Sequence, residues 1–480
     1  MKIVQAASEF YPFIKTGGLA DVTSALSKSL ASYGHEISVF LPGYRTVLES
    51  PELAKAKSVA TIQVEVGQEF LRGDVLEVKL AKGLTLFVIR RDEFFDRRFA
   101  YSVSGRDYDD NERRFTFFSK AIVESIHVLD LKADILHCHD WQTGLAPLLL
   151  RLEEQKTGNS YALKTFFTIH NMSFQGLFPK GAFRFTNLPA EFMSLEGLEF
   201  FGQISFMKAG ILFADKIITV SPSYAKEILT PDFGYGMDGT LKSREEDLIG
   251  IVNGIDVDEW NPGSDPALPA KYSRSKMVGK AECRKKMLET VGLSDSEENP
   301  VYGIVCRLTP QKGIDLLLEQ IKFFVKNDCR LVVLGRGEEP LQKALRKAAK
   351  DYPKHVAVRI EMNEELAHLI EAGSDFFLLP SVFEPCGLNQ MYSQRYGTIP
   401  LASNIGGLKD TVLCHRDDPE ESTGISFEPN KKAFSEALSC SMELYSNPKT
   451  FKQMQHRAMS KDFSWKTAAK KYEQIYLDSV

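Results

Sequence analysis

Two copies of the sequence Gly-Gly-Leu-Xaa-Asp place a glycine pair where a strand is expected to give way to a helix. A helix N-terminus offers unpaired N–H groups and a partial positive charge, and glycine lets an anion come close to them. The pairs therefore predict two anion-binding turns, at Gly17-Gly18 and at Gly406-Gly407. The alternative is a glycine-rich turn without a ligand.

The first copy carries additional chemistry. Lys15 precedes it and would add a full positive charge suited to a diphosphate, while Asp21 could orient sugar hydroxyls or the loop itself. A second pair of cations, Arg307 and Lys312, follows a buried strand in the second half of the chain. A guanidinium fork and an ammonium at one turn suit a leaving diphosphate, whose charge grows as its bond breaks.

The segment from His137 to Trp141 crowds imidazoles, a thiol and a carboxylate together. No metal site is predicted, because alternation along a strand puts the two histidines on one face and Cys138 on the other. We expect Asp140 to face a sugar and Trp141 to act as an apolar platform. Ordinary packing at a strand end is the alternative.

His170 and Glu384 also follow buried strands. His170 could donate to a substrate oxygen, although a lone histidine at a strand end is often structural. Glu384 could bind sugar hydroxyls or stabilise an oxocarbenium ion. Only one such carboxylate is evident, so the paired carboxylates of common glycoside hydrolases are not predicted. Cys386 is expected to be a packed thiol and not a nucleophile, since no motif pairs it with a histidine.

The elements that must position these residues alternate between strand and helix. Buried strands are predicted at 2–7, 36–41, 134–138, 164–168, 216–220 and 248–252, with an antiparallel excursion at 61–66, 75–80 and 84–89. The second half repeats the pattern at 301–306, 330–334, 356–361, 375–379 and 398–402. The fold class predicted is α/β, with two doubly wound Rossmann-like domains facing a cleft.

The expected boundary lies near Asn253, where the pattern loosens into a segment rich in Pro and Gly. We expect an N-terminal domain at 1–250, joined by a C-terminal helix at 463–480, and a second domain at 251–462. Such a division suits 480 residues, which exceed the usual size of one core.

Composition excludes several classes of protein. Basic and acidic residues, 59 and 64, nearly balance, so neither nucleic acid nor an anionic membrane is predicted as a partner. Seven cysteines without zinc-type spacing indicate reduced thiols. No targeting segment or long apolar run is evident, and a cytoplasmic protein is expected.

Taken together, these motifs resemble the bacterial glycogen synthase and plant starch synthase family of retaining glucosyltransferases. The resemblance covers nearly the whole chain and rests on stretches at 15–21, 137–145, 168–176, 235–239, 252–256, 307–313, 384–400 and 406–412. It implies a two-domain glycosyltransferase B fold that moves glucose from a nucleotide sugar, usually ADP-glucose, to the non-reducing end of an α-1,4-glucan such as glycogen or a maltooligosaccharide. No metal or other cofactor is implied.

The resemblance also implies roles for residues. Arg307 and Lys312 would neutralise the diphosphate, Lys15 would assist, and the amides around Gly406 and Gly407 would complete the anion pocket. His170, Asp140 and Glu384 would surround the glucosyl unit, and Trp141 with the loop near Tyr235 would face donor or acceptor. Further substrate-binding residues are expected at Asn253, Cys386 and Gly387.

The chain departs from the family pattern in three places. Ser403-Asn404-Ile405 stands where Arg-Xaa-Thr is frequent, Thr309-Pro310 replaces Thr-Trp, and Tyr392 occupies the position of a second glutamate in related transferases. The first departure leaves UDP-glucose open as donor. Another nucleotide-sugar transferase, such as one making a disaccharide, and a catalytically silent glucan-binding or regulatory protein stay as alternatives; a phosphorylase is disfavoured, because the chain is short and shows no pyridoxal phosphate lysine motif.

Overall fold

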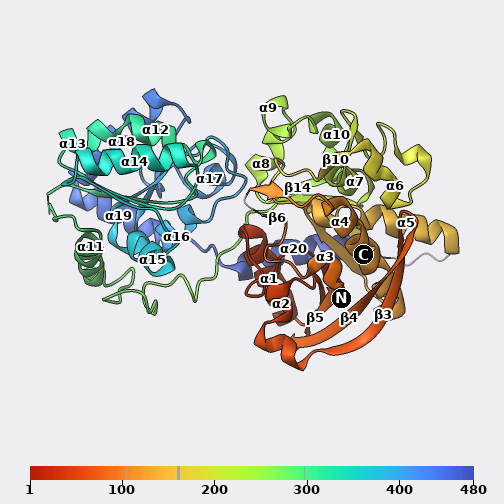
Figure 1. Ribbon diagram of the computed structural model, residues 1–480. Coiled ribbons are helices and arrows are strands. Elements are labelled where there is room, and N and C mark those ends of the chain that lie inside the picture. The colour runs from red at the N-terminus through yellow and green to blue at the C-terminus, as the bar shows by residue number, and fades with distance from the viewer. Residues whose placement is uncertain (104, 159–162, 297) are drawn as a thin grey trace. The chain divides into compact units, whose positions relative to one another are not determined.

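The computed structural model describes residues 1–103, 105–158, 163–296 and 298–480. These residues form two compact units (Figure 1). Unit 1 comprises 1–220, 225–251 and 465–480, and unit 2 comprises 221–224 and 252–464. The chain therefore passes from one unit to the other four times.

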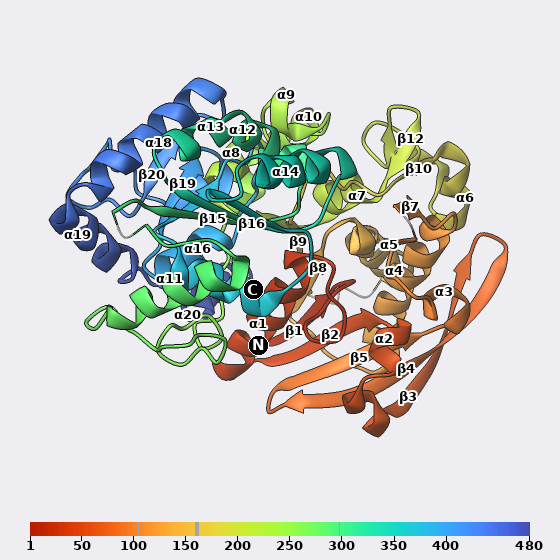
Figure 2. The same cartoon turned by 60° about the vertical axis from the view of Figure 1, so that its left-hand side comes forward.

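Unit 1 is built on a nine-stranded sheet, whose long β3–β4 ribbon forms one edge (Figure 2). In spatial order its strands are β14 (Leu248–Gly250), β13 (Lys216–Thr219), β9 (Lys164–Ile169), β8 (Ile135–His139), β1 (Lys2–Ala6), β2 (Glu36–Pro42), β5 (Leu84–Arg90), β4 (Glu69–Ala81) and β3 (Lys57–Val66).

The predicted antiparallel segment is confirmed for β3 and β4, but β5 is only partly antiparallel. β4 pairs antiparallel with both neighbours, whereas β5 also pairs parallel with β2 and so belongs to the parallel sheet. Small antiparallel sheets that the sequence did not indicate are formed by β6 (Ser102–Val103) with β7 (Arg106–Asp107), and by β10 (Leu177–Pro179), β12 (Gln203–Ser205) and β11 (Glu199–Phe200).

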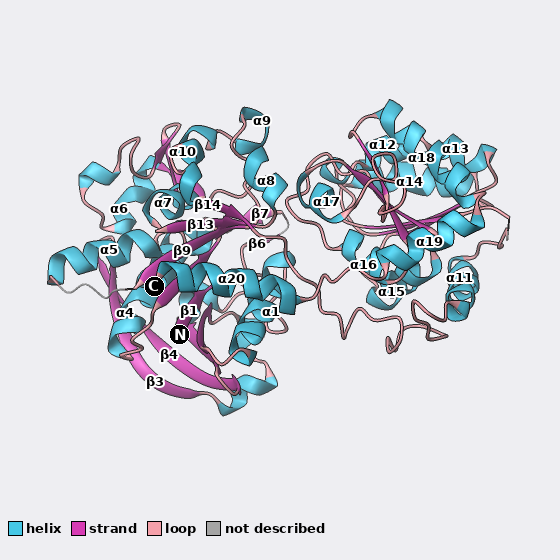
Figure 3. Ribbon diagram, turned by 180° about the vertical axis from the view of Figure 1, so that it is seen from behind, coloured by secondary structure: helices cyan, strands magenta, loops and turns pink. Residues whose placement is uncertain are grey.

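Helices cover this sheet (Figure 3). They are α1 (Gly18–Ser32), α2 (Arg45–Leu48), α3 (Asp92–Phe95), α4 (Asn111–Val128), α5 (Ala146–Thr157), α6 (Phe183–Thr186), α7 (Phe206–Phe213), α9 (Pro231–Gly234), α10 (Asp238–Lys242) and α20 (Trp465–Ser479), together with part of α8 (Pro222–Glu227). None of the helices in the described part of the chain has the length and apolar character needed to cross a bilayer.

The C-terminal helix α20 packs beside α1 in unit 1 (Figure 3). Tyr33 Oη donates to Lys466 O at 2.6 Å, and His35 Nε2 lies 2.7 Å from Glu473 Oε1. Tyr472 and Tyr476 of α20 are fully buried. Burial of large aromatic side chains is a main source of packing energy, so the last helix is an integral part of unit 1.

Unit 2 has a wholly parallel sheet of six strands. In spatial order these are β17 (Val356–Arg359), β16 (Arg330–Leu334), β15 (Val301–Val305), β18 (Phe376–Leu379), β19 (Ile399–Ser403) and β20 (Ile425–Phe427). The sequence analysis predicted the first five and missed β20.

Both faces of the unit 2 sheet are buried. On β16, Leu331 and Val333 enter one hydrophobic cluster while Val332 and Leu334 enter another, because successive side chains point to opposite faces. The helices are α11 (Val278–Val291), α12 (Ile314–Glu319), α13 (Ile321–Lys326), α14 (Glu339–Asp351), α15 (Glu364–Gly373), α16 (Asn389–Arg395), α17 (Gly406–Thr411), α18 (Lys431–Tyr445) and α19 (Pro448–Ala458). The predicted α/β class with doubly wound sheets is confirmed.

Candidate active site

Three neighbouring strands of unit 1 end in polar residues. Glu9 follows β1, Asp140 follows β8 and His170 follows β9, and these strands are adjacent in the order β9-β8-β1. Because the strands are parallel, their carboxyl ends share one edge of the sheet, which is where such folds bind ligands.

His137, His139 and His170 form a buried histidine cluster at this edge. The rings of His137 and His139 lie 4.2 Å apart, as expected for residues on one face of a strand, and His139 Nδ1 lies 3.0 Å from His170 Nε2. Burial lowers the pKa of His137 and of His170 to about 3, and it lowers the pKa of His139 well below its ordinary value. The three rings are therefore neutral near pH 7.

Hydrogen bonds fix the protonation of these neutral rings. Gln5 Oε1 lies 2.7 Å from His139 Nε2 and accepts from it, so Nδ1 of His139 is the acceptor for His170 Nε2–H. His170 is left with Nδ1 as its second, accepting nitrogen. In this tautomer His170 offers Nδ1 to accept from a hydroxyl, whereas the opposite tautomer would donate; donation by His170 to a substrate oxygen stays a prediction.

Asp140 connects β8 to the loop after β9. Its Oδ1 accepts from His170 N at 2.8 Å, and its backbone has φ 55° and ψ −178°, which is unusual for a residue with a side chain. Burial raises the pKa of Asp140 to about 7, the hydrogen bond from His170 N opposes the shift, and the charge of Glu9 adds to it. The site therefore contains a carboxyl group that titrates near neutral pH.

Trp141 does not form an open platform. Its side chain is 9% exposed, its ring packs at 4.9 Å from the ring of Phe115 and 5.7 Å from that of Phe178, and a side chain at Gly176 would collide with it at 2.6 Å. Trp141 thus supports the loop at 174–179 from within. Tyr235, which accepts from Gln175 Nε2 through its carbonyl, is by contrast 45% exposed.

The first glycine pair is open and its loop is held by Glu9. The Glu9 carboxylate, 3% exposed, accepts from Thr16 N at 2.6 Å and from Gly17 N at 3.3 Å. Gly17 and Gly18 are exposed, with no atom within 4 Å of an added Cβ. Lys15 Nζ lies 2.8 Å from Asp21 Oδ1, so Asp21 orients the lysine of its own loop.

The corresponding edge of unit 2 carries the two predicted cations. Arg307 follows β15 and is exposed, and within the described residues its guanidinium has no hydrogen-bond or ion-pair partner. Lys312 Nζ donates to Glu384 Oε2 in a largely buried ion pair, and Ser381 Oγ donates to the same oxygen at 3.1 Å. The structure thus brings Lys312 and Glu384 together, where the sequence had placed them near different parts of one substrate.

Gly313 allows the turn that carries Lys312. Its φ of 66° lies in the left-handed region, and an added Cβ would lie 1.9 Å from Pro380 O. A glycine is required by both the conformation and the space.

The second glycine pair is closed. Gly407 N donates to Glu384 O at 3.2 Å and to Pro385 O at 3.1 Å, and a Cβ on Gly406 would lie 2.0 Å from Glu384 O. Both glycines are buried, and α17 has six residues. In this structure the Gly407 amide is already engaged by the chain, and the pair lets the chain pack tightly against the loop that carries Glu384. An anion pocket formed by the amides around Gly406 and Gly407 stays a prediction.

Asp21 and Asp410, which end the two Gly-Gly-Leu-Xaa-Asp segments, also make different contacts. Asp410 accepts from Ser223 N at 2.9 Å and from Ser223 Oγ at 2.6 Å. These bonds join the start of α8 to α17 within unit 2, which explains why 221–224 belong to that unit.

Cys386 is a packed thiol, as expected. It is 5% exposed, and burial raises its pKa to about 12, against the effect of hydrogen bonds with Asn253. Asn253 is also buried, and its Oδ1 has no partner among the described residues. Gly387, at φ 70°, has the Gln390 side chain 2.6 Å from where its Cβ would be. These residues shape the loop beneath Glu384.

The departures from the family pattern have local consequences. Asn404 Nδ2 donates to Glu428 Oε1 at 3.2 Å, and Ile405 is 6% exposed. The hydroxyls of Ser403 and Thr309 are buried without a partner in the described residues. The ring of Tyr392 stacks on Trp260 at 3.7 Å, so at this position the chain uses an aromatic side chain for packing.

Sequence reasoning missed Gln5, Glu9 and Tyr476 as residues that organise the site. Tyr476 Oη lies 2.7 Å from His137 Nδ1, although 339 positions separate the two in sequence. The position of Glu9 just after a buried strand was a signal of the same kind as that used for His170 and Glu384.

The two doubly wound units, with polar groups at the carboxyl ends of their strands, define a glycosyltransferase of the two-domain GT-B type. Family models agree with this class: a starch synthase catalytic domain matches residues 2–243, and a glycosyl transferases group 1 domain matches residues 292–460. The chain belongs to the glycogen synthase and starch synthase family, and its activity is the glucosyl transfer of that family.

Individual relatives are similar over the full length. A glycogen synthase of Opitutus terrae is 50% identical over all of both chains, and one of Cellvibrio japonicus is 44% identical over 99% of this chain and 98% of its own. The catalytic domain of starch synthase IV from Arabidopsis thaliana, solved with ADP and acarbose, has a TM-score of 0.88 at 32% identity and covers 99% of each chain. The resemblance and the enzyme class expected from the sequence are confirmed.

Proposed function

We propose that this protein transfers glucose from ADP-glucose to the non-reducing end of an α-1,4-glucan, such as glycogen or a maltooligosaccharide, with retention of configuration. The observation that carries the proposal lies in unit 2. The guanidinium of Arg307, which has no partner among the described residues, stands exposed at the same sheet edge as the Lys312–Glu384 pair. Two cations and one carboxylate suit a diphosphate attached to a sugar.

The diphosphate is bound and stabilised as it leaves by Arg307 and Lys312. When the donor binds, the Lys312 ammonium contacts both Glu384 and a phosphate oxygen. Glu384 then faces the glucosyl unit. Charge that develops on the leaving group is then met by fixed cations, which is the kind of electrostatic stabilisation that contributes most in many enzymes.

Retention proceeds by displacement on one face of the sugar, without an enzymic nucleophile. The Cys386 thiol has a pKa of about 12 and is buried, so it is not a thiolate at pH 7. Glu384 is already engaged by Lys312 and Ser381. The leaving phosphate therefore takes the proton of the incoming hydroxyl, and positioning supplies much of the rate.

Unit 1 supplies sugar contacts. His170 Nδ1 accepts from a hydroxyl, Asp140 holds the His170 loop, and the exposed ring of Tyr235 provides apolar surface for a glucan. The exposed loop at Gly17 and Gly18, with Lys15, is the anion-binding candidate of this unit, although Gly17 N already donates to Glu9.

One observation supports ADP-glucose as the donor, and another supports a cytoplasmic location. The Arabidopsis thaliana relative was solved with ADP, which favours an adenine nucleotide. All seven cysteines are free thiols, which suits a cytoplasmic protein.

The test is incorporation of labelled glucose into glycogen from ADP-glucose and, separately, from UDP-glucose. Product linkage is determined with α-1,4-specific hydrolases, and a parallel reaction contains a chelator, because no metal is required. We expect faster transfer from ADP-glucose and α-1,4 products. Preference for UDP-glucose would overturn the donor, transfer to small sugars alone would indicate a disaccharide-forming enzyme, and no turnover of either donor would indicate a silent glucan-binding protein.

A further inference from the structure

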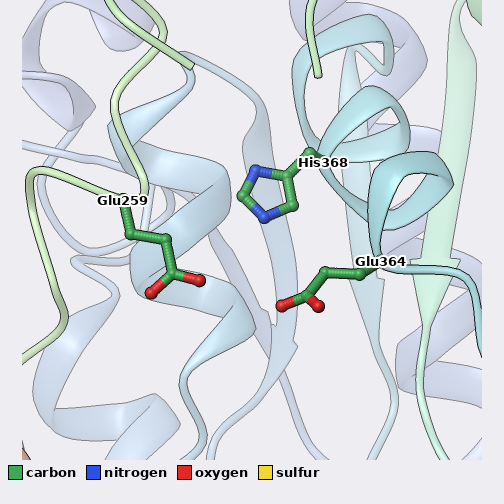
Figure 4. Close-up of side chains that lie close together, drawn as sticks. All are labelled: Glu259, Glu364 and His368. Atoms are coloured by element: carbon green, nitrogen blue, oxygen red, sulfur yellow. The ribbon is translucent and has the colours of Figure 1, made fainter. Parts of the chain in front are cut away.

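Three potential metal ligands converge in unit 2. They are Glu259, Glu364 and His368, and one ligand atom of each lies within 4.8 Å of those of the others (Figure 4). Glu364 is the first residue of α15 and His368 lies one turn further along it, so both are on one face of the helix. Glu259 comes from the segment that precedes α11.

His368 is built into the fold with one nitrogen directed at the carboxylates. The residue is 6% exposed, and its Nδ1 lies 2.8 Å from Oδ2 of Asp265, which is 1% exposed. Figure 4 shows the other ring nitrogen facing the gap between the two glutamates. Within the described residues, this Nε2 has no hydrogen-bond or ion-pair partner.

The His368 ring is oriented from behind by Asp265. The Asp265 carboxylate accepts from Nδ1 of His368, and Tyr396 Oη donates to the same oxygen at 2.5 Å. Nε2 is thereby the ring nitrogen that faces the glutamates. A carboxylate behind a histidine in this way orients the ring and increases its basicity towards a metal.

The ring is also held in its plane by stacking. Trp260 lies face to face with His368 at 3.8 Å and an interplanar angle of 11°, and Tyr392 stacks on the other side of Trp260 at 3.7 Å. Asn363 Oδ1 caps α15 by accepting from Leu366 N at 2.9 Å, which fixes the start of the helix beside Glu364. One nitrogen ligand is thus preorganised, and the two exposed glutamates can adjust to it.

We propose that Glu259, Glu364 and His368 bind one divalent transition-metal ion of the zinc type. Imidazole with two carboxylates suits zinc better than calcium or magnesium, which prefer oxygen alone. Ligand atoms around tetrahedral zinc stand roughly 3.4 Å apart. The ligand atoms, which lie within 4.8 Å of one another, therefore need to close by at most about 1.4 Å, which rotation of the exposed glutamate side chains provides.

The ion would have a structural role. It would connect the segment at 256–262 to α15, and none of its ligands belongs to the catalytic assignments made above. A simpler reading is that Glu364 stabilises the helix N-terminus and that Glu259 is a surface charge. The two readings differ in whether the chain binds a metal at this place.

The experiment uses the full chain freed of metal with a chelator and then titrated with Zn²⁺ in a calorimeter. The variants are Glu259→Gln and Glu364→Gln, and the matched control is Glu365→Gln, an exposed glutamate in the same helical turn. His368 itself is left intact, because removing its ring would disturb the stack with Trp260.

We expect the wild type and Glu365→Gln to bind one Zn²⁺ at this site with equal affinity and each ligand variant to bind it at least tenfold more weakly. Zn²⁺ should raise the melting temperature of the wild type and of the control, and this rise should be lost in the Glu259→Gln/Glu364→Gln double variant. Unchanged binding in the ligand variants would overturn the proposal. So would no binding by the wild type at about 0.1 mM Zn²⁺, roughly a thousandfold or more above the dissociation constant that ~10 kcal/mol of binding energy implies.

Discussion

Replacing Lys312 by Met tests whether the buried Lys312–Glu384 pair serves catalysis or structure. Methionine keeps the apolar stem and removes the charge. A cation about 4 Å from a developing phosphate charge is worth on the order of 4 kcal/mol at an effective dielectric constant of 20. Since 1.36 kcal/mol corresponds to a factor of ten in rate, turnover should fall by about a thousandfold.

The same substitution has a structural cost that must be separated from the catalytic one. It leaves the Glu384 carboxylate, 9% exposed, without its cation, and removal of one partner of a buried pair costs about 3 kcal/mol of stability. The double variant Lys312→Met/Glu384→Gln removes the orphaned charge as well. Its melting temperature should recover, whereas its turnover should not.

The assay measures kcat and KM for labelled ADP-glucose together with the melting temperature of each variant. Lys322→Met is the control, because Lys322 is an exposed lysine of α13 in the same unit. If turnover of Lys312→Met stays within tenfold of wild type while its melting temperature falls, Lys312 has a structural role only and the diphosphate assignment is refuted.

Three further predictions concern other parts of the site. Arg307→Leu should raise KM for the donor by 10- to 100-fold, or about 1.5–3 kcal/mol, without lowering the melting temperature, because Arg307 is exposed; an unchanged KM would contradict its role. Gly407→Ala should destabilise the fold by about 2 kcal/mol or more, since the added Cβ would lie 2.2 Å from Cys386 O. Gly17→Ala, whose Cβ would have no neighbour within 4 Å, should leave the free energy of unfolding unchanged in denaturant titrations. Equal effects of the two substitutions would show that the two glycine pairs are alike. The buried histidine cluster should stay neutral down to pH 5, because burial lowers its pKa values, and the ¹⁵N shifts of labelled histidine rings would report this. Below pH 6.5 the unfolded chain binds more protons than the folded one, so the stability from these groups, present above pH 6.5, is lost as pH falls by about 1.4 kcal/mol per histidine and pH unit. Titration of the rings near pH 6.5 would contradict the reasoning.

The sequence predicted those features that depend on local pattern. Buried runs such as that of β16 are long and apolar enough to mark strands, and polar residues just after them mark a binding edge. β14 and β20 have three residues each, but β14 lies in the apolar run at 248–252, whereas β20 is interrupted by Ser426 and followed by Glu428, so no apolar run marks it. The α/β class and the positions of Arg307, Lys312 and Glu384 could thus be inferred, whereas the complete sheet could not.

Contacts between distant segments could not be inferred from one sequence. A glycine pair indicates that something approaches closely, but it does not say whether an anion or the chain itself does so. At Gly407 it is the chain, through Glu384 O and Pro385 O. The accepting nitrogen of His170 likewise depends on Gln5, a residue on another strand that no motif marks.

The return of α20 to unit 1 has a consequence for synthesis of the protein. Tyr476, which bonds to His137, leaves the ribosome only after all of unit 2 has been made. At typical elongation rates the gap lasts on the order of ten seconds or more. During that time nascent unit 1 lacks the helix that covers its buried histidines, while unit 2, apart from 221–224, is contiguous and can fold as it emerges. Completion of unit 1 therefore awaits synthesis of α20, and a chain truncated before α20 would have an unfinished unit 1.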